Sequence, residues 1–322
     1  MATYKGISGF NIKSLSSDPS NLVEGEIWYN STSGTLKVAP FVESWASGGT
    51  MNTARYSLAG AGTQTLAVVF GGGTPPTLSD ATETYDGASW TTSPATLNTA
   101  RSNLAGFGTS TAAIAAGGNT PSVTDSTESF NGSAWTANPT GLNTARQHLS
   151  SAIQGTSTAG LVFGGEGPPY LTATESWGGS TWTTEPNSLN TALSDGAGAG
   201  TQTSALAFGG EPAKTETEEW NGTSWAVGGV MNNARTSNAA AGSQTAAITF
   251  CGNGPGAPVR ILTESYDGSS WSTKPNMATS RYGAAGAGTS TAGLAAGGYI
   301  SAVSDVTEEF TGEATAETIT TS

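Results

Sequence analysis

The sequence has one cysteine, one histidine and few charged residues. Charged residues make up 11% of the 322 positions, and Cys251 is the only cysteine. An intrachain disulfide is therefore excluded, so packing and sheet hydrogen bonds have to supply the stability. Because His148 is the only histidine, a metal site built from several imidazoles is excluded as well.

Basic residues and long apolar runs are also scarce. Eleven Lys and Arg residues stand against 24 Asp and Glu residues, which gives a formal net charge of −13 and a pI near 4.3. Such a chain offers no cationic surface, so neither nucleic acid nor an anionic membrane surface is expected as a partner. No apolar stretch has the length of a signal peptide or a membrane span, and we expect synthesis in a cytoplasm.

What the sequence does have is a sixfold repeat. Tryptophans recur at a spacing of about 45 residues, the period of a propeller blade or another stacked unit. They are Trp45, Trp90, Trp135, Trp182, Trp225 and Trp271. After each comes a motif of the type Asn-Thr-Ala-Arg. These motifs are Asn52–Arg55, Asn98–Arg101, Asn143–Arg146, Asn190–Leu193, Asn232–Arg235 and Met277–Arg281.

One repeat, residues 55–98, reads as four short strands. A segment of small residues, an apolar segment, an alternating segment and a tryptophan-bearing segment follow one another. They span residues 56–62, 66–70, 81–85 and 89–92. Asp86-Gly87 predicts a tight hairpin between the last two, because type I′ turns need positive φ. In every repeat a paired glycine position closes the second strand, and the third strand carries a glutamate with an aromatic residue two positions on.

This order of paired glycine, aromatic residue and tryptophan resembles the kelch repeat of β-propellers. The resemblance covers about residues 40–312, with inner strands that are unusually rich in Ala, Gly and Ser. The last repeat lacks its tryptophan, whereas residues 41–45 precede the first motif. We therefore predict an all-β fold: a six-bladed kelch-like β-propeller of four-stranded blades over residues 39–312, closed by the N-terminal strand around Trp45. The Thr-rich residues 313–322 are expected to form a C-terminal tail or a competing edge strand.

Residues 1–38 lie outside the repeat and read as a β-hairpin module. Its strands are expected around residues 22–29 and 35–38, joined by a turn. A module of this size buries little by itself, so it should pack on the propeller or on another chain. Trp28 and Tyr29 are expected to be exposed, serving either hairpin packing or contact with a partner.

The stretch Gly25-Glu-Ile-Trp-Tyr-Asn-Ser-Thr-Ser-Gly-Thr-Leu-Lys-Val38 is similar to segments in structural and fibre proteins of tailed bacteriophages, notably marine ones. That resemblance covers about a tenth of the chain. It implies a virion protein with an N-terminal attachment segment, in which Trp28 and Tyr29 belong to the attachment module. It also implies other virion proteins as partners through this module, and a homo-oligomer within the virion.

Arginine and glutamate recur at fixed repeat positions, which allows two interpretations. One is a ring of charges that binds an anion in a central channel. The other is a repeated structural ion pair or hydrogen bond between strands or blades, which explains the recurrence better than an asymmetric active site would. The residues are Arg55, Arg101, Arg146, Arg235 and Arg281, with Glu83, Glu128, Glu175, Glu218, Glu264 and Glu308.

Propeller enzymes are the main alternative, and the sequence disfavours them. A copper site like that of galactose oxidase needs two imidazoles, and a sialidase needs an arginine cluster outside the repeat. His148 is expected on an inner strand without a catalytic triad, and Cys251 as a buried inert thiol in a glycine position. Calcium binding at Asp80, Asp125 and Asp305 is disfavoured because they form no dense acidic motif. We therefore expect no catalytic residue, no metal and no cofactor.

Sequence diversity concentrates in the loops between the second and third strands. A constant scaffold with one diverse loop face is how binding modules are built, although loops also diverge by drift. These loops are Gly73–Asp80, Asn119–Ser126, Glu166–Thr172, Glu211–Thr217, Asn253–Leu262 and Tyr299–Asp305. The candidate ligand- or receptor-binding residues on this face are Tyr170, Arg260, Tyr299, Pro168 and Pro258, with Pro75 beside them.

The sequence thus predicts a non-enzymatic bacteriophage virion protein. It would be a fibre, tail appendage or capsid decoration whose propeller binds a host-surface glycan or protein. A carbohydrate-binding module of a bacterial cell-surface or secreted protein is the second hypothesis. A propeller glycoside hydrolase is the third.

Overall fold

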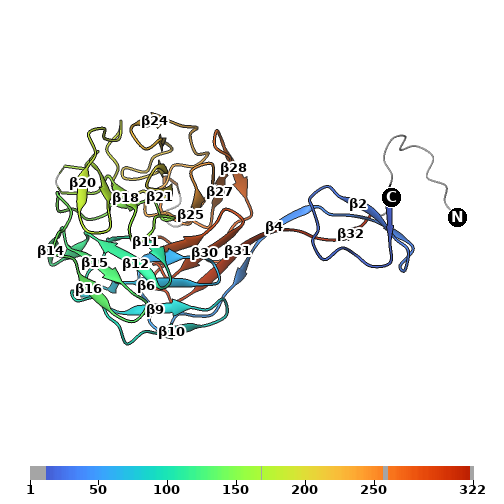
Figure 1. The fold of residues 1–322 in the computed structure, drawn as a ribbon, viewed down its shortest axis with the longest axis horizontal. Coiled ribbons are helices and arrows are strands. Elements are labelled where there is room, and N and C mark those ends of the chain that lie inside the picture. The colour runs from blue at the N-terminus through green and yellow to red at the C-terminus, as the bar shows by residue number, and fades with distance from the viewer. Residues whose placement is uncertain (1–11, 168, 257–259, 320–322) are drawn as a thin grey trace. The chain divides into compact units, whose positions relative to one another are not determined.

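The computed structural model describes residues 12–167, 169–256 and 260–319, and within these it contains strands and no helix. Two compact units make up the chain: Met1–Ser44 with Thr311–Ser322, and Trp45–Phe310. The second unit consists of repeated four-stranded sheets grouped around a common centre (Figure 1). This all-β arrangement is consistent with a β-propeller.

The sheets of the second unit are antiparallel meanders, in which the strands run in order from the centre outwards. The first three consist of β5 (Ala59–Gly62), β6 (Ala67–Phe70), β9 (Thr82–Tyr85) and β10 (Trp90–Thr92); β11 (Ala105–Thr109), β12 (Ala112–Ala116), β15 (Thr127–Phe130) and β16 (Trp135–Ala137); and β17 (Ser150–Ser151), β18 (Gly160–Phe163), β19 (Thr174–Trp177) and β20 (Trp182–Thr184). Two short hairpins lie in the loops, β7 (Gly73–Thr74) with β8 (Thr77–Leu78) and β13 (Asn119–Thr120) with β14 (Ser122–Val123).

The next three sheets repeat the pattern. They consist of β21 (Ala197–Thr201), β22 (Ser204–Phe208), β23 (Thr217–Trp220) and β24 (Trp225–Val227); β25 (Ala239–Ser243), β26 (Ala246–Phe250), β27 (Thr263–Tyr266) and β28 (Trp271–Lys274); and β29 (Ala285–Gly288), β30 (Ala292–Ala296), β31 (Thr307–Ala314) and β4 (Phe41–Ser47). The outer strand of the last sheet therefore comes from the chain segment that precedes the first repeat.

The inner strands are neighbours in a closed circle. β5 lies beside β11, and the contacts continue through β17, β21, β25 and β29 back to β5. A cluster of buried apolar and aromatic side chains fills each space between consecutive sheets. Phe70 of the first sheet, for example, packs edge-on against Trp135 of the second, with ring centroids 4.7 Å apart.

Each tryptophan of the repeat ties its sheet to the preceding one. The Trp135 indole Nε1 donates a hydrogen bond of 2.9 Å to Thr82 Oγ1. Thr82 is the first residue of the third strand in the preceding sheet. Equivalent bonds of the same length join Trp90 to Thr307 and Trp45 to Thr263, so the series closes on itself. The remaining members are Trp182–Thr127, Trp225–Thr174 and Trp271–Thr217.

A second closed series runs through the backbone just before the inner strands. The N–H of Asn103 donates to the carbonyl of Ser57 over 2.9 Å. In each later repeat the residue at the same position donates to the carbonyl of its counterpart in the preceding repeat. The series closes where the N–H of Ser57 donates to the carbonyl of Gly283 over 2.8 Å. All of these residues have positive φ, between 52° and 62°. We call them the mouth ring: Ser57, Asn103, His148, Asp195, Ser237 and Gly283.

The mouth ring corrects two expectations from the sequence. The first inner strand was predicted over residues 56–62 but begins at Ala59, because the left-handed backbone at Ser57 breaks the extended conformation. His148 for the same reason precedes its strand and does not belong to it.

Glycine and alanine on the inner strands permit close approach of neighbouring strands. A Cβ atom on Gly198 would stand 2.3 Å from the carbonyl oxygen of Ser151 on the neighbouring strand, and one on Gly286 would stand 2.2 Å from that of Ala240. Larger residues would force the circle of inner strands apart. The compositional bias of these segments is thus a packing requirement.

The first unit is a small sheet in the order β1 (Lys13–Leu15), β2 (Ile27–Asn30), β3 (Thr35–Val38) and β32 (Glu317–Thr318). β2 and β3 form the expected hairpin, while β1 adds in parallel and Glu317–Thr318 of the Thr-rich segment adds at the other edge. The expectation that Trp28 is exposed is wrong. Its ring is fully buried, and its Nε1 donates to Asp18 Oδ1 over 3.0 Å; Tyr29, on the opposite face of the strand, is 39% exposed.

We expect Gly198→Ala to lower the free energy of unfolding by about 1–3 kcal/mol, because the added methyl group would overlap Ser151 O and Phe163 Cζ. Gly178→Ala is the matched control: its Cβ would have no neighbour nearer than 3.8 Å. Urea denaturation of both variants measures the difference. Equal stability of the two variants would contradict the close-approach argument.

Candidate functional site

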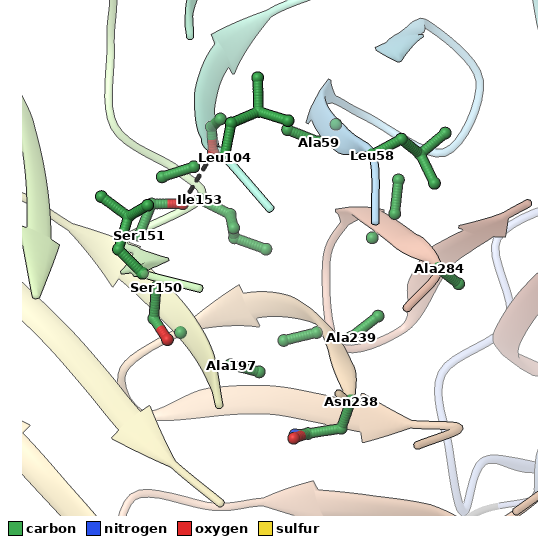
Figure 2. Close-up of a pocket in the computed structure, with 18 of the residues that line it drawn as sticks. Leu58, Ala59, Leu104, Ser150, Ser151, Ile153, Ala197, Asn238, Ala239 and Ala284 are labelled. Atoms are coloured by element: carbon green, nitrogen blue, oxygen red, sulfur yellow. Dashed lines mark hydrogen bonds between the residues drawn. The ribbon is translucent and has the colours of Figure 1, made fainter. Parts of the chain in front are cut away.

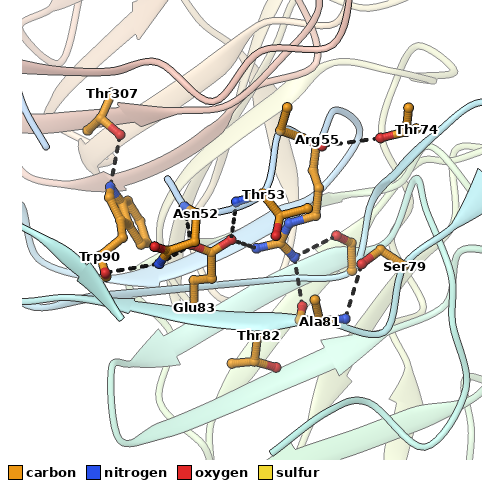
Figure 3. A network of polar contacts seen from close by, with 12 residues as sticks. Asn52, Thr53, Arg55, Thr74, Ser79, Ala81, Thr82, Glu83, Trp90 and Thr307 are labelled. Carbon is orange, nitrogen blue, oxygen red and sulfur yellow. Dashed lines mark hydrogen bonds and ion pairs between the residues drawn. The ribbon is translucent and has the colours of Figure 1, made fainter. Parts of the chain in front are cut away.

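The repeated arginine and glutamate meet inside each repeat. Arg55 Nη2 lies 3.0 Å from Glu83 Oε1, and both side chains are buried (Figure 3). Arg55 Nη1 donates to the carbonyls of Gly71 and Ala81, while Glu83 accepts the backbone and side-chain amides of Asn52. Asn52 Nδ2 also donates to Trp90 O. The Asn-Thr-Ala-Arg segment is thereby fastened to the third and fourth strands of its own sheet.

The same pair recurs in most repeats. The other pairs are Arg101–Glu128, Arg146–Glu175, Arg235–Glu264 and Arg281–Glu308. Burial lowers the pKa of Arg101, and the charge of Glu128 offsets only part of this. Because these guanidinium groups are buried within their sheets, they do not present charge to the central channel.

The fourth repeat has Leu193 in the arginine position. Glu218 there accepts hydrogen bonds from the backbone N–H groups of Asn190 and Thr191 and from the Asn190 side chain. Lys214 Nζ donates to Ala192 O over 2.6 Å, in the segment that corresponds to the Asn-Thr-Ala-Arg motif of the other repeats.

The circle of inner strands encloses a narrow channel lined by small residues. Figure 2 shows residues of successive inner strands, among them Ala59, Ala197 and Ala239, arranged around a cavity of about 100 Å³. Two features narrow the channel at the end where the turns between the first and second strands lie. The segment from Arg146 to Gly165 is two residues longer than its counterparts, which places Ile153 in the lining. Gln154 Nε2 also lies 3.5 Å from the carbonyl oxygen of Gly288, on the opposite inner strand.

The opposite end of the channel, on the side of the variable loops, is polar. The six mouth-ring residues line a cavity of about 110 Å³ there. His148 Nδ1 lies 3.2 Å from Asp195 Oδ1, and the hydroxyls of Ser237 and Thr236 donate to Asp195 Oδ2. Three neighbours thus contact one carboxylate, and both of its oxygens have a partner.

This cluster shifts the protonation of both charged partners. Burial disfavours the charged form of His148, but the hydrogen bond and charge of Asp195, with the charge of Glu166, outweigh it and raise the pKa above 6.5. Burial likewise opposes the charge on Asp195, yet its hydrogen bonds and the charge of His148 lower the pKa below 3.8. An ion pair therefore forms in the acidic to neutral range.

A second cavity, of about 210 Å³, adjoins the mouth ring at Asn103. Tyr56, Pro75, Pro76 and Asn119 are among its lining residues. The Tyr56 ring is held in place by two further tyrosines. Its centroid lies 6.4 Å from that of Tyr282 and 5.6 Å from that of Tyr299.

The candidate binding residues from the sequence are spread over the loop side. Tyr299 belongs to the tyrosine cluster, and Pro75 lines the second cavity. Tyr170 is 40% exposed in its own loop, and Arg260 Nη2 donates to Pro255 O. The remaining two candidates, Pro168 and Pro258, lie outside the described residues.

The other residues considered for chemistry have structural roles here. Cys251 is fully buried, with φ of 56° in a glycine position, and burial raises the pKa of its thiol. The backbone carbonyls of Asp80, Asp125 and Asp305 accept N–H groups of Leu97, Leu142 and Met51. Among the residues that the structure describes, no group of three or more His, Cys, Asp or Glu is placed to hold a metal ion, and no helix could cross a membrane.

Asn103, Asp195 and Tyr56 were not predicted from the sequence. A signal existed: the residue two positions after the motif is Ser, Asn, His, Asp, Ser or Gly in the six repeats. Asn, Asp, His and Gly are the residues that most readily adopt positive φ, so a turn at this position could have been predicted.

No protein-family model matches the chain, and no curated protein matches it either. The functional assignment therefore rests on the residues themselves.

We expect Arg101→Met to lower the free energy of unfolding by about 3–5 kcal/mol, because it leaves the buried Glu128 carboxylate without its cation. Thermal or urea denaturation measures the loss. The double variant Arg101→Met/Glu128→Gln should regain part of it, and Arg260→Met, which removes a loop arginine, should change stability little. A loss as small as that of Arg260→Met would show that the pair contributes nothing to folding.

We expect the His148 imidazole to titrate above 6.5, and Asp195→Asn to lower that pKa. The sole histidine makes the NMR titration unambiguous. The raised pKa of His148 stabilises the folded state fully below a pH of about 6.5, and this stabilisation is lost as the pH rises through the pKa of the folded state. The lowered pKa of Asp195 stabilises the folded state above a pH of about 3.8, and this stabilisation is lost as the pH falls through the pKa of the folded state. Asp80→Asn, in an exposed loop, is the control; an unchanged titration in Asp195→Asn would refute the pairing.

Proposed function

We propose that the chain is a non-enzymatic binding protein built as a six-bladed kelch-like β-propeller. Three observations support six blades: the circle of inner strands, the tryptophan–threonine series and the mouth ring each return to their starting repeat after six steps. The kelch-like assignment rests on the repeat pattern in the sequence. Radial repetition of this kind leaves only short, protected sheet edges at the centre.

Binding, and not catalysis, is the function that the geometry supports best. The observation that carries it is the polar mouth ring joined at Asn103 to a cavity with an aromatic wall, on the side where loops differ between repeats. The one carboxylate–imidazole pair has its hydroxyl partner on the carboxylate and not on the imidazole. This is not the order of a Ser–His–Asp triad, in which the imidazole contacts the hydroxyl directly.

As the biological setting we propose a bacteriophage virion, with the chain as a fibre, tail appendage or capsid decoration that contacts the host surface. The resemblance of residues 25–38 to phage structural proteins supports this. In this proposal the first unit attaches to other virion proteins, with Tyr29 and its exposed neighbours as the contact surface. Trp28 then acts indirectly, by holding the hairpin and Asp18 together.

The second candidate is a carbohydrate-binding module of a bacterial cell-surface or secreted protein. The cavities on the loop side favour it as much as they favour the virion protein. Only the N-terminal segment separates the two.

Immunogold labelling with an antibody against residues 45–310, on particles purified from the source culture, tests the virion assignment. We expect discrete labelling of tails or capsids, with a pre-immune serum as the control. Protein found only free or on cell envelopes would overturn the virion assignment and favour the second candidate. Binding of the fluorescently labelled chain to host cells tests the binding role separately.

A further inference from the structure

We infer that the mouth of the channel and the cavity beside Tyr56 form one site for a neutral oligosaccharide. This inference rests on the proposed binding role of the loop side. The two cavities, of about 110 and 210 Å³, share Asn103 in their linings. Together they fall at the lower end of the range of about 300–1,000 Å³ that is usual for small-molecule sites.

The charge of this site favours a neutral ligand. Among the described residues that line the two cavities there is no lysine or arginine, and the charge of His148 is already paired with Asp195, so a carboxylated or phosphorylated ligand would meet no unpaired cation. Asp195 is the one carboxylate, and His148, Ser237 and Thr236 already occupy its oxygens. A cationic ligand would therefore meet a carboxylate whose charge His148 already balances.

The hydrogen-bonding groups of the site match hydroxyl groups. Within the described part of the chain, no protein group hydrogen-bonds the side-chain amide of Asn103, which lies where the cavities join. A sugar hydroxyl both donates and accepts, and so can satisfy an amide at either atom.

The second cavity adds an apolar surface. Tyr56 is half-buried and held by Tyr282 and Tyr299, while Pro75 and Pro76 line the same cavity. A rigid aromatic ring beside a few placed polar groups is the usual composition of a site that orients a ligand with apolar and polar faces. A pyranose ring, with C–H groups on its faces and hydroxyls at its edge, has this character.

An extended peptide fits the site less well. Peptides commonly bind by adding a strand to a free sheet edge. The N–H groups of the mouth ring already donate to carbonyls of the neighbouring repeats, so the mouth offers no such edge.

The test uses the full chain, fluorescently labelled, on an array of neutral, carboxylated, sulfated and amine-bearing oligosaccharides. We expect binding to neutral members, followed by calorimetry with the strongest of them. Asn103→Gly removes the amide and keeps a residue suited to the φ of 55°, and Tyr56→Leu removes the aromatic ring. Each should weaken binding at least tenfold, with an unchanged unfolding midpoint confirming the fold. Leu66→Ala, in an exposed turn between the first and second strands, is the control and should bind normally.

The outcomes separate the site from the binding role. Binding to host cells without binding to any neutral oligosaccharide would overturn the ligand class and leave the proposed function standing. Neutral binding that survives Asn103→Gly and Tyr56→Leu but is lost in Tyr170→Ala would overturn the site and keep the loop side as the binding surface. Neutral binding that is lost in both site variants would support the inference, even if the chain failed to bind host cells and the proposed function fell.

Discussion

Closure of the inner circle of strands is the constraint from which the other features of the second unit follow. Each mouth-ring residue donates its N–H to the preceding repeat, and Ser57 completes the series at Gly283. Removing one repeat would leave a donor and an acceptor without partners at the centre, at about 1–3 kcal/mol for each buried group. Glycine at positions such as Gly198 and Gly286 lets the strands approach closely enough for these bonds to form.

The buried ion pairs serve the same closure from inside each repeat. Arg55 and Glu83 fasten the connecting segment to its own sheet, which sets where the next inner strand begins. A buried pair of this kind is a weak source of net stability, because desolvation offsets most of the attraction. Its value here is positional, since the pair and the hydrogen bonds from Asn52 to Glu83 fix the connecting segment against the sheet. The fourth repeat, with Leu193, has no arginine but keeps the hydrogen bonds from its Asn-Thr segment to Glu218 that the first repeat makes to Glu83.

Departures from the repeat gather around the channel. The two extra residues near Ile153 narrow one end, and the mouth ring at the other end consists of six residues of five different types. Three tyrosines gather where the first and last repeats meet. Positions that break local regularity in an otherwise uniform scaffold are where function is expected, because regular packing does not require them.

The strand order within each repeat, the apolar second strand and the tight hairpin could all be predicted from the chain alone, because alternation and turn residues are local signals. Val68 and Val69, for example, lie in a buried strand as predicted. The recurrence of arginine and glutamate also indicated a structural pairing. The interruption at Ser57 was indicated only by the Asn, His, Asp and Gly residues at the same position of other repeats. Local patterns could not show that Trp28 is buried against Asp18, since that depends on contacts with residues distant in the chain.

Which residues share a site is settled by packing in three dimensions. Asn103, Asp195 and Tyr56 belong to three different repeats, and although Asn103 and Asp195 occupy the same position of their repeats, the sequence does not show that these residues lie around one opening. They come together because the inner strands form a circle, which brings the same position of every repeat to the channel mouth. The sequence by itself determines the period of the repeat. The cavity forms only when packing between the sheets arranges the repeats in a circle.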